Sequence, residues 1–167
     1  AETFGIPVSE TQAGKSAMSW KDPMSVGAVG VTGTSAANLL AKAADVVLVV
    51  GSRLQDFTTA SKHVFDADVK LLHLNVNKFD GLKMGSTMLQ ADAKSGLESL
   101  KDELINVDFQ TSTEYRARVA KLQKEWNGEV DRLYNLKSKD GNVQTSVVGI
   151  LNKFMAPEDV VLCAAGS

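Results

Sequence analysis

The chain has 167 residues, 44% of them hydrophobic and 23% charged, with 18 Lys and Arg against 20 Asp and Glu. This balance argues against disorder throughout, against a basic nucleic-acid-binding module and against polybasic docking to a membrane. The sequence has no apolar run of the roughly 18 residues typical of a transmembrane helix, no secretory signal, and one cysteine, Cys163, so we expect a cytoplasmic protein.

The first two-thirds of the chain alternates between strand and helix patterns. The first eight residues are typical of a helix end, a glycine stop at Gly5 and the entry to a strand. The aliphatic run 45–51 is typical of a parallel strand buried on both faces. A helix is predicted before this strand, over 35–44, and it begins at Thr34 or Ser35. After the strand, the sequence predicts strands over 70–76 and 88–91 and a helix over 93–104 that is capped by Asp92.

This alternation predicts an α/β fold over about residues 5–110, a three-layer α/β/α domain with a Rossmann-like parallel sheet. The strands 45–51 and 70–76 are expected to be neighbours or nearly so. Apolar residues at steps of three and four then predict a long helix over 113–136, packed on its own protein. A turn over 138–142, a helix over 144–154, Pro157 and a buried strand over 159–163 complete the pattern.

Common catalytic and metal-binding motifs are absent from the sequence. It has no P-loop, no G-x-G-x-x-G dinucleotide fingerprint, no H-E-x-x-H zinc motif and no G-x-S-x-G nucleophile elbow. His73 lies in a predicted strand and is expected to be a hydrogen-bonded structural residue, whereas His63 is expected at the surface. Cys163 is expected to be an inert core thiol. We therefore assign no catalytic or metal-ligating residue.

Two glycine-containing segments are candidates for a binding site. The first, 27–38, precedes a helix whose N-terminal amides could face an anion; its candidate residues are Gly30, Gly33, Thr34, Ser35 and Asn38. Taken alone, it favours a tight loop with a capped helix and no ligand. The second, 51–59, follows the best strand and offers Gly51 and Arg53 to a phosphate or carboxylate, although an Arg53–Asp56 loop ion pair would equally account for it.

These segments, together with Gly5-Ile6-Pro7-Val8-Ser9-Glu10-Thr11-Gln12-Ala13-Gly14-Lys15, resemble the central domain of thiamine-diphosphate-dependent enzymes. Within that superfamily they are most similar to the hydrolases of inositol catabolism that act on 3D-(3,5/4)-trihydroxycyclohexane-1,2-dione. Acetolactate synthases are more distant relatives. The resemblance covers nearly the whole chain. It implies a central domain over 1–110, a linker helix and turn over 111–142, and the start of a diphosphate-binding domain over 143–167.

The resemblance also implies that the chain is part of a longer subunit. The family's catalytic glutamate and its diphosphate motif fall outside this sequence, so thiamine diphosphate and Mg²⁺ are expected to bind elsewhere in the parent enzyme, and the chain alone is expected to be inactive. Some members hold FAD or a nucleotide in this domain. The expected partners are the first and last domains of the parent, which is expected to be a homo-oligomer. An acetolactate synthase-type carboligase and a free-standing nucleotide-binding module remain alternatives.

One expectation concerns the sheet itself. The family's central domain opens with a strand that precedes the segment beginning at Ala1 and that lies between two others. We expect its slot to be closed by direct pairing of the flanking strands, by another segment, by a second chain, or else by a segment upstream of Ala1. Because their packing surface is also missing, Trp126 and the strand 160–163 are expected to be more exposed than their residue types suggest.

Overall fold

The structure, a computed structural model, describes residues 1–139, 141, 143–156 and 158–162. The chain forms two compact units, residues 1–126 and 127–167. Two 3₁₀ turns, Glu2–Phe4 and Gln12–Gly14, accompany the regular elements: strands β1 Val8–Glu10, β2 Ser25–Ala28, β3 Val46–Val50, β4 Lys70–Leu74 and β5 Thr87–Leu89, and helices α1 Ser35–Lys42, α2 Asp56–Thr59, α3 Lys78–Leu82, α4 Ala93–Asn106, α5 Thr113–Tyr134 and α6 Gln144–Phe154.

All strand pairs in the described residues are parallel, and they form two pieces of sheet. One piece has the order β1-β2, and the other has the order β3-β4-β5. In the second piece Val46 pairs with Lys70 and Val50 with Leu74, so the strands predicted over 45–51 and 70–76 are direct neighbours. The third strand, predicted over 88–91, runs from Thr87 to Leu89 on the far side of β4.

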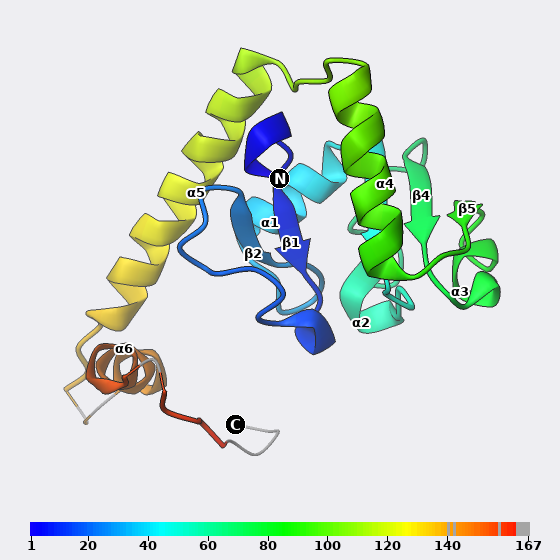
Figure 1. Ribbon diagram of the computed structural model, residues 1–167. Coiled ribbons are helices and arrows are strands. Elements are labelled where there is room, and N and C mark those ends of the chain that lie inside the picture. The colour runs from blue at the N-terminus through cyan, green and yellow to red at the C-terminus, as the bar shows by residue number, and fades with distance from the viewer. Residues whose placement is uncertain (140, 142, 157, 163–167) are drawn as a thin grey trace. The chain divides into compact units, whose positions relative to one another are not determined.

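Helices lie on both faces of the β3-β4-β5 piece. On one face, Gly81 of α3 comes so near His73 that an added Cβ would lie 3.1 Å from the His73 Cβ. On the other face, Gly96 of α4 lies against the side chain of Leu74, the next residue along β4. Successive residues of a strand point to opposite faces, so α3 and α4 sandwich the sheet (Figure 1). The three-layer, Rossmann-like fold predicted from the sequence is confirmed.

The helix α1 connects the two pieces of sheet through its packing. Its residues Ala36, Ala37 and Leu40 are buried against Val26 of β2. Ala41, on the same helix, packs against the second buried cluster, which includes Val49 of β3 and Phe65. The helix begins where the sequence predicted, because the Thr34 hydroxyl accepts a hydrogen bond from the Ala37 amide at 3.0 Å.

The prediction that β3 is buried on both faces is wrong. Val49 is 5% exposed, but Val46, Leu48 and Val50 on the opposite face are 46%, 41% and 36% exposed. The aliphatic run suits a strand covered on two sides, yet only one of its faces is covered by the described residues. The aliphatic sequence predicts that both faces of the strand can be buried. Whether they are buried depends on the elements that pack against each face.

The N-terminal segment is held by residues about a hundred positions away. Gly5 ends the first turn in a left-handed conformation, with φ of 69°, as its glycine stop predicted. The Thr111 amide donates to the Phe4 carbonyl at 3.0 Å, and the Gln123 side chain donates to the Ser25 carbonyl at 2.7 Å. The first half of α5 therefore packs on its own protein, as expected.

One face of that half of α5 is apolar. Val119 is completely buried among residues of β2 and α1, and Tyr115, Leu122 and Trp126 pack partly buried around it. Burial raises the pKa of the Tyr115 hydroxyl, because the charged phenolate would lose hydration there. Trp126 is thus half-buried within the first unit rather than open to solvent.

The second unit contains α6, which confirms the helix predicted over 144–154. Gly149 of α6 lies against Tyr134, and the Thr145 hydroxyl donates to the Leu133 carbonyl at 3.0 Å. Of the predicted turn, Ser138 and Gly141 form an isolated antiparallel bridge. Asp140 and Asn142 of that turn, as well as Pro157 and Cys163, lie outside the described residues.

The strand predicted over 159–163 is not formed in its described part. Residues 159–162 carry no strand assignment, and Val160, Val161 and Leu162 are 83%, 57% and 93% exposed. The expected high exposure of this segment is confirmed, whereas its strand conformation is not. A strand needs a neighbouring strand for its backbone hydrogen bonds, and no described residue supplies one here.

The slot between the two pieces of sheet is not closed. Within the described residues β1 pairs only with β2, and β3 pairs only with β4. Within the described residues the flanking strands do not pair directly and no other segment fills the slot, whereas closure by a second chain or by upstream residues stays a prediction. The two pieces are instead held together by α1 and by one loop bond, from the Val31 amide to the Phe57 carbonyl at 3.0 Å.

Candidate functional site

The loop between β2 and α1 closes on itself through its own polar groups. The Asn38 side chain accepts from the Gly30 amide and donates to the Gly30 carbonyl, both at 2.9 Å. The Thr34 hydroxyl donates to the Val26 carbonyl at 2.6 Å while it caps α1. These contacts occupy the side chains of Asn38 and Thr34, which the sequence offered as ligand-binding groups.

Glycine is needed in this loop because the backbone is crowded. Gly30 has φ of 109°, and an added Cβ would overlap the Phe57 carbonyl and lie 2.7 Å from that of Thr58. At Gly33 an added Cβ would lie 2.7 Å from the Ala28 carbonyl. Gly30 therefore allows close packing of the loop against α2, and Gly33 allows close packing of the loop on its own backbone. Ser35 is exposed at the first turn of α1.

The loop after β3 is open. Gly51 has φ of 63° with nothing within 4 Å of an added Cβ. The Ser52 carbonyl accepts from the Asn75 side chain at 3.2 Å and lies 2.8 Å from His73 Nε2, so buried groups in β4 and directly after it fix the start of the loop. Arg53 is exposed, and among the described residues it forms no ion pair, with Asp56 or with any other carboxylate.

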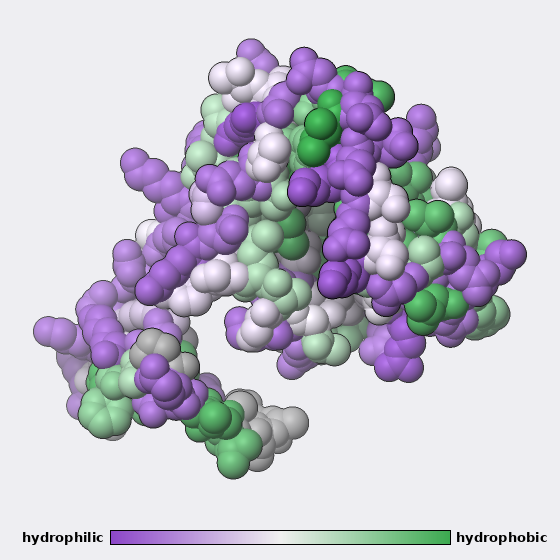
Figure 2. Space-filling view, in the orientation of Figure 1, coloured by the Kyte–Doolittle hydropathy of each residue, from purple (hydrophilic) through white to green (hydrophobic). Residues whose placement is uncertain are grey.

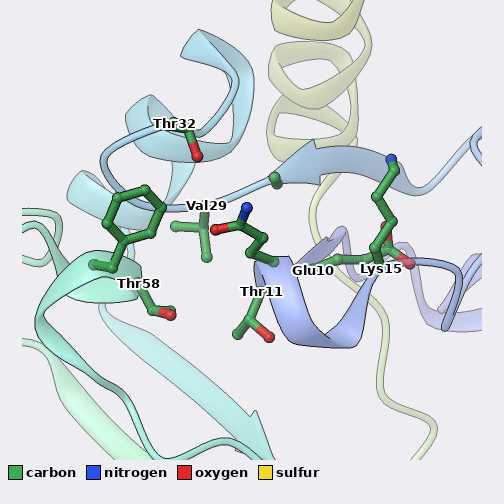
Figure 3. A pocket seen from close by; sticks show the side chains of 9 residues that line it. Glu10, Thr11, Lys15, Val29, Thr32 and Thr58 are labelled. Carbon is green, nitrogen blue, oxygen red and sulfur yellow. The ribbon is translucent and has the colours of Figure 1, made fainter. Parts of the chain in front are cut away.

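Two adjoining clefts lie where β1, β2 and β3 end. The larger, about 620 Å³, lies between residues 11–14 and residues 50–55, and Arg53 and Gly51 line it. The smaller, about 190 Å³, is lined by residues of both loops. In Figure 3, Glu10, Thr11 and Lys15 enter this cleft from one side and Val29, Thr32 and Thr58 from the other. Both clefts share Thr11, Gln12, Phe57 and Thr58.

The structure brings together only part of the predicted site. Gly51 and Arg53 line the larger cleft, whereas none of the five candidates from the first loop lines either cleft. The sequence reasoning missed the turn after β1 as a wall of both clefts. Its signal was Thr11, followed three residues later by Gly14, whose amide donates to the Thr11 side chain at 3.0 Å. We predict that a small ligand, if one binds this domain, lies where residues 30–38 meet Arg53.

Comparison with known proteins places this arrangement in a family. Residues 1–100 match the model described as "Thiamine pyrophosphate enzyme, central domain". The chain belongs to this family. It is also 38% identical over 192 residues to 3D-(3,5/4)-trihydroxycyclohexane-1,2-dione hydrolase from Bacillus cereus (strain AH820), and 35% identical to the protein of the same name from Clostridium tetani. Both alignments cover all of this chain and 30% of the relative, so the chain spans under a third of these relatives' length.

Within this thiamine pyrophosphate enzyme central domain, the buried polar groups near the cleft have structural roles. His73 is 1% exposed, and its Nε2 donates to the Ser52 carbonyl, which leaves Nδ1 as an acceptor without a partner among the described residues. His63 is exposed at the surface, as predicted. Within residues 1–139, 141, 143–156 and 158–162, no group of three His, Cys, Asp or Glu side chains could hold a metal ion.

None of the helices in the part of the chain that the structure describes is both long enough and apolar enough to span a bilayer. The longest, α5, has 22 residues, but charged side chains recur along its exposed faces.

Proposed function

We propose that this chain is the central part of a thiamine-diphosphate-dependent hydrolase that cleaves a carbon–carbon bond and opens the ring of trihydroxycyclohexane-1,2-dione in myo-inositol degradation. One observation carries the proposal: the 38% identity to a hydrolase of that name extends over the whole chain, beyond residues 1–100 that match the family model. A likeness limited to the central domain would be shared with many thiamine enzymes of other activities.

In this proposal the chain supplies a scaffold and the rest of the subunit supplies the chemistry. Thiamine diphosphate provides an electron sink for the bond cleavage when it is bound. The described residues offer no acidic cluster for the accompanying Mg²⁺, so we assign this chain no metal ligand and no catalytic step. Its partners are the first and last domains of a cytoplasmic, homo-oligomeric parent. By itself the chain is inactive.

The activity is tested on the longer protein that contains this sequence. Purified with thiamine diphosphate and Mg²⁺, it should consume trihydroxycyclohexane-1,2-dione, and removal of the cofactor should abolish the reaction. The competing proposal, a carboligase of acetolactate synthase type, predicts acetolactate formation from pyruvate under the same conditions. Turnover of pyruvate without turnover of the cyclic dione would refute the hydrolase assignment.

The proposal that the cofactor sites lie outside this chain is tested on the chain itself. Calorimetric titration with thiamine diphosphate and Mg²⁺ should give no heat of binding, because the expected diphosphate and pyrimidine sites lie outside this sequence. Micromolar binding by the chain alone would contradict the proposal that the cofactor sites belong to other domains.

A second proposed role is binding of a nucleotide or FAD in the larger cleft. The observation that favours it is an exposed Arg53 beside Gly51, at the end of β3 in a parallel sheet, with no ion pair to any residue that the structure describes. ADP or FAD should bind the wild-type chain, and Arg53→Ala should weaken binding by tenfold or more. Arg118→Ala is the matched control, since Arg118 is an exposed arginine on α5. Equal effects of the two variants would contradict this role.

A further inference from the structure

The long helix α5 belongs to both compact units. The division between the units falls between Trp126 and Asn127, inside the helix rather than in a loop. Before the division, Val119 is completely buried, and Trp126 packs partly buried against the same cluster. After the division, Tyr134 lies against Gly149 of α6. Each end of α5 is therefore packed within a different unit, and the helix passes from one unit to the other near Asn127.

Gly128 stands just after this division. A glycine inside a helix weakens it, because the residue has no side chain to restrict its backbone. At the other α-helical glycines of the described residues, Gly81, Gly96 and Gly149, an added Cβ would come too close to a neighbouring side chain, so close packing requires glycine there. Gly128 is exposed, and an added Cβ would meet nothing within 4 Å. Asn127 beside it is also a weak helix former.

The charged residues around Gly128 do not support the helix across it. Glu125 and Glu129 lie four positions apart on one face of α5, where like charges repel each other. Lys121 lies 3.9 Å from the carboxylate of Glu125, and Arg132 lies 2.7 Å from that of Glu129. One ion pair therefore ends before the glycine and the other begins after it, so neither of them spans it.

The exposed faces of α5 are hydrophilic. Figure 2 shows purple side chains along this helix, whose course is drawn in Figure 1. Water can solvate such side chains in a bent helix as well as in a straight one. The apolar packing of Tyr115, Val119, Leu122 and Trp126 fixes the first half of α5. Residues 127–129 contribute no apolar side chain, so they lack packing of this kind.

We propose that α5 bends reversibly at Asn127 and Gly128, which act as a hinge between the two compact units. Hinges are a few residues that absorb a change in backbone dihedral angles while the elements on either side stay folded. Glycine absorbs such a change at the least steric cost. The segment after the hinge takes more than one orientation relative to residues 1–126. Such a hinge acts in the chain itself, whatever activity the longer protein has.

Amide hydrogen exchange of the intact 167-residue chain tests the local weakness of the helix. In an α-helix the amide of residue i bonds to the carbonyl of residue i−4, so a bend at 127–128 opens the amides of about residues 128–132. These amides should exchange roughly tenfold faster than those of 120–126 or more, with protection restored at Leu133 and Tyr134. Gly128→Ala should slow their exchange about fivefold, the ratio expected from the helix propensities of glycine and alanine.

The distance between two spin labels tests the motion itself. Arg118→Cys and Lys153→Cys place one label on an exposed position of each unit, in a chain whose native thiol is removed by Cys163→Ser. The distance distribution should be broad when residue 128 is glycine. Gly128→Ala should lower the population of bent conformers about fivefold and narrow the distribution, for the same difference in helix propensity.

A matched control introduces a glycine into the first half of α5. Ala120 is exposed, as Gly128 is, but it follows the buried Val119 in the part of the helix that packs on the first unit. Ala120→Gly should speed amide exchange near residue 120 and leave the spin-label distribution unchanged, because packing on both sides of this position holds the helix. Circular dichroism should show that both glycine and alanine variants remain folded.

Three results would overturn the hinge. The first is amide exchange at 128–132 that is as slow as at 120–126. The second is equally fast exchange throughout 127–134 and α6, since the second unit would then unfold rather than turn. The third is a spin-label distribution that is as narrow with Gly128 as with Gly128→Ala, or that broadens in Ala120→Gly.

Discussion

The loops after β2 and after β3 both contain glycines at the carboxyl end of a parallel strand, yet they differ in what their polar groups do. In the first loop, Asn38 and Thr34 bond to the loop's own backbone, and Gly30 packs against α2. In the second, Gly51 has open space around it, and Arg53 is free of ion pairs among the described residues. A glycine-rich loop before a helix can thus be purely structural, while the loop after β3, which has fewer glycines, lines the larger cleft.

The largest expected contrast is between the two glycines. Gly30→Ala should lower the free energy of unfolding by about 3 kcal/mol, because the new Cβ meets the Phe57 and Thr58 carbonyls in a left-handed conformation. Gly51→Ala should cost about 1 kcal/mol, from its positive φ alone. Urea denaturation followed by circular dichroism measures both. Similar urea midpoints for the two variants would contradict this prediction, because they would show that the first loop accommodates an added Cβ as easily as the second.

Removing a polar side chain from each loop gives the next contrast. Asn38→Ala should lower stability by about 1–3 kcal/mol, since it leaves the Gly30 amide without its partner, while the Gly30 carbonyl keeps only its bond from the Gly33 amide. Arg53→Ala should change stability by less than about 0.5 kcal/mol, because Arg53 is exposed and forms no ion pair within the described part of the chain. Thermal unfolding of the two variants at one pH is the measurement. A destabilised Arg53→Ala would mean that the second loop is also held by its side chains.

The cap of α1 should have a smaller effect. Thr34→Ala removes the acceptor for the Ala37 amide and should cost about 1 kcal/mol. Ser35→Ala is the control, because Ser35 is exposed and the Thr34 side chain caps the helix. Chemical denaturation should separate the two variants. If they behave alike, the closed loop does not depend on the cap.

The smallest expected effect is a pH dependence of the free energy of unfolding, which arises from Tyr115 in the apolar cluster around α1. Burial raises the pKa of Tyr115 in the folded state, so its contribution to stability is fully present below the ordinary tyrosine value of about 10 and is lost as the pH rises through the higher folded value. Stability measured from pH 9 to 11 should fall less steeply in Tyr115→Phe than in the wild type. Identical slopes would place Tyr115 in water rather than against Val119.

The sequence predicted most elements of the first unit because periodicity and capping residues are local signals. Thr34, Asp92 and Gly5 mark element ends in the structure as they do in the sequence. The closure of the first loop was not predictable in the same way. It depends on an amide, Asn38, reaching back eight residues to Gly30, and no spacing rule distinguishes that bond from a bond to a ligand.

Two segments with the same four residues show the limit of local reasoning. Asp45 to Leu48 and Asp159 to Leu162 both read Asp-Val-Val-Leu. In the first segment Val46 to Leu48 lie in β3, where β4 supplies the backbone partners, whereas the second segment has no strand conformation. Strand propensity is a measure of fit to a surface that must be present. The apolar face of β3 is exposed for the same reason, because no described residue provides a surface that covers it.

The bond between Thr111 and Phe4 joins residues 107 positions apart, and it sets an order of events during synthesis. At about 5–20 residues per second, a ribosome needs about 5 to 20 s to travel from one to the other. Throughout that interval Phe4 and Val26 lack the part of α5 that covers or fastens them. A nascent chain stalled before Val119 should therefore be captured by chaperones or cut by proteases more readily than one released after Trp126.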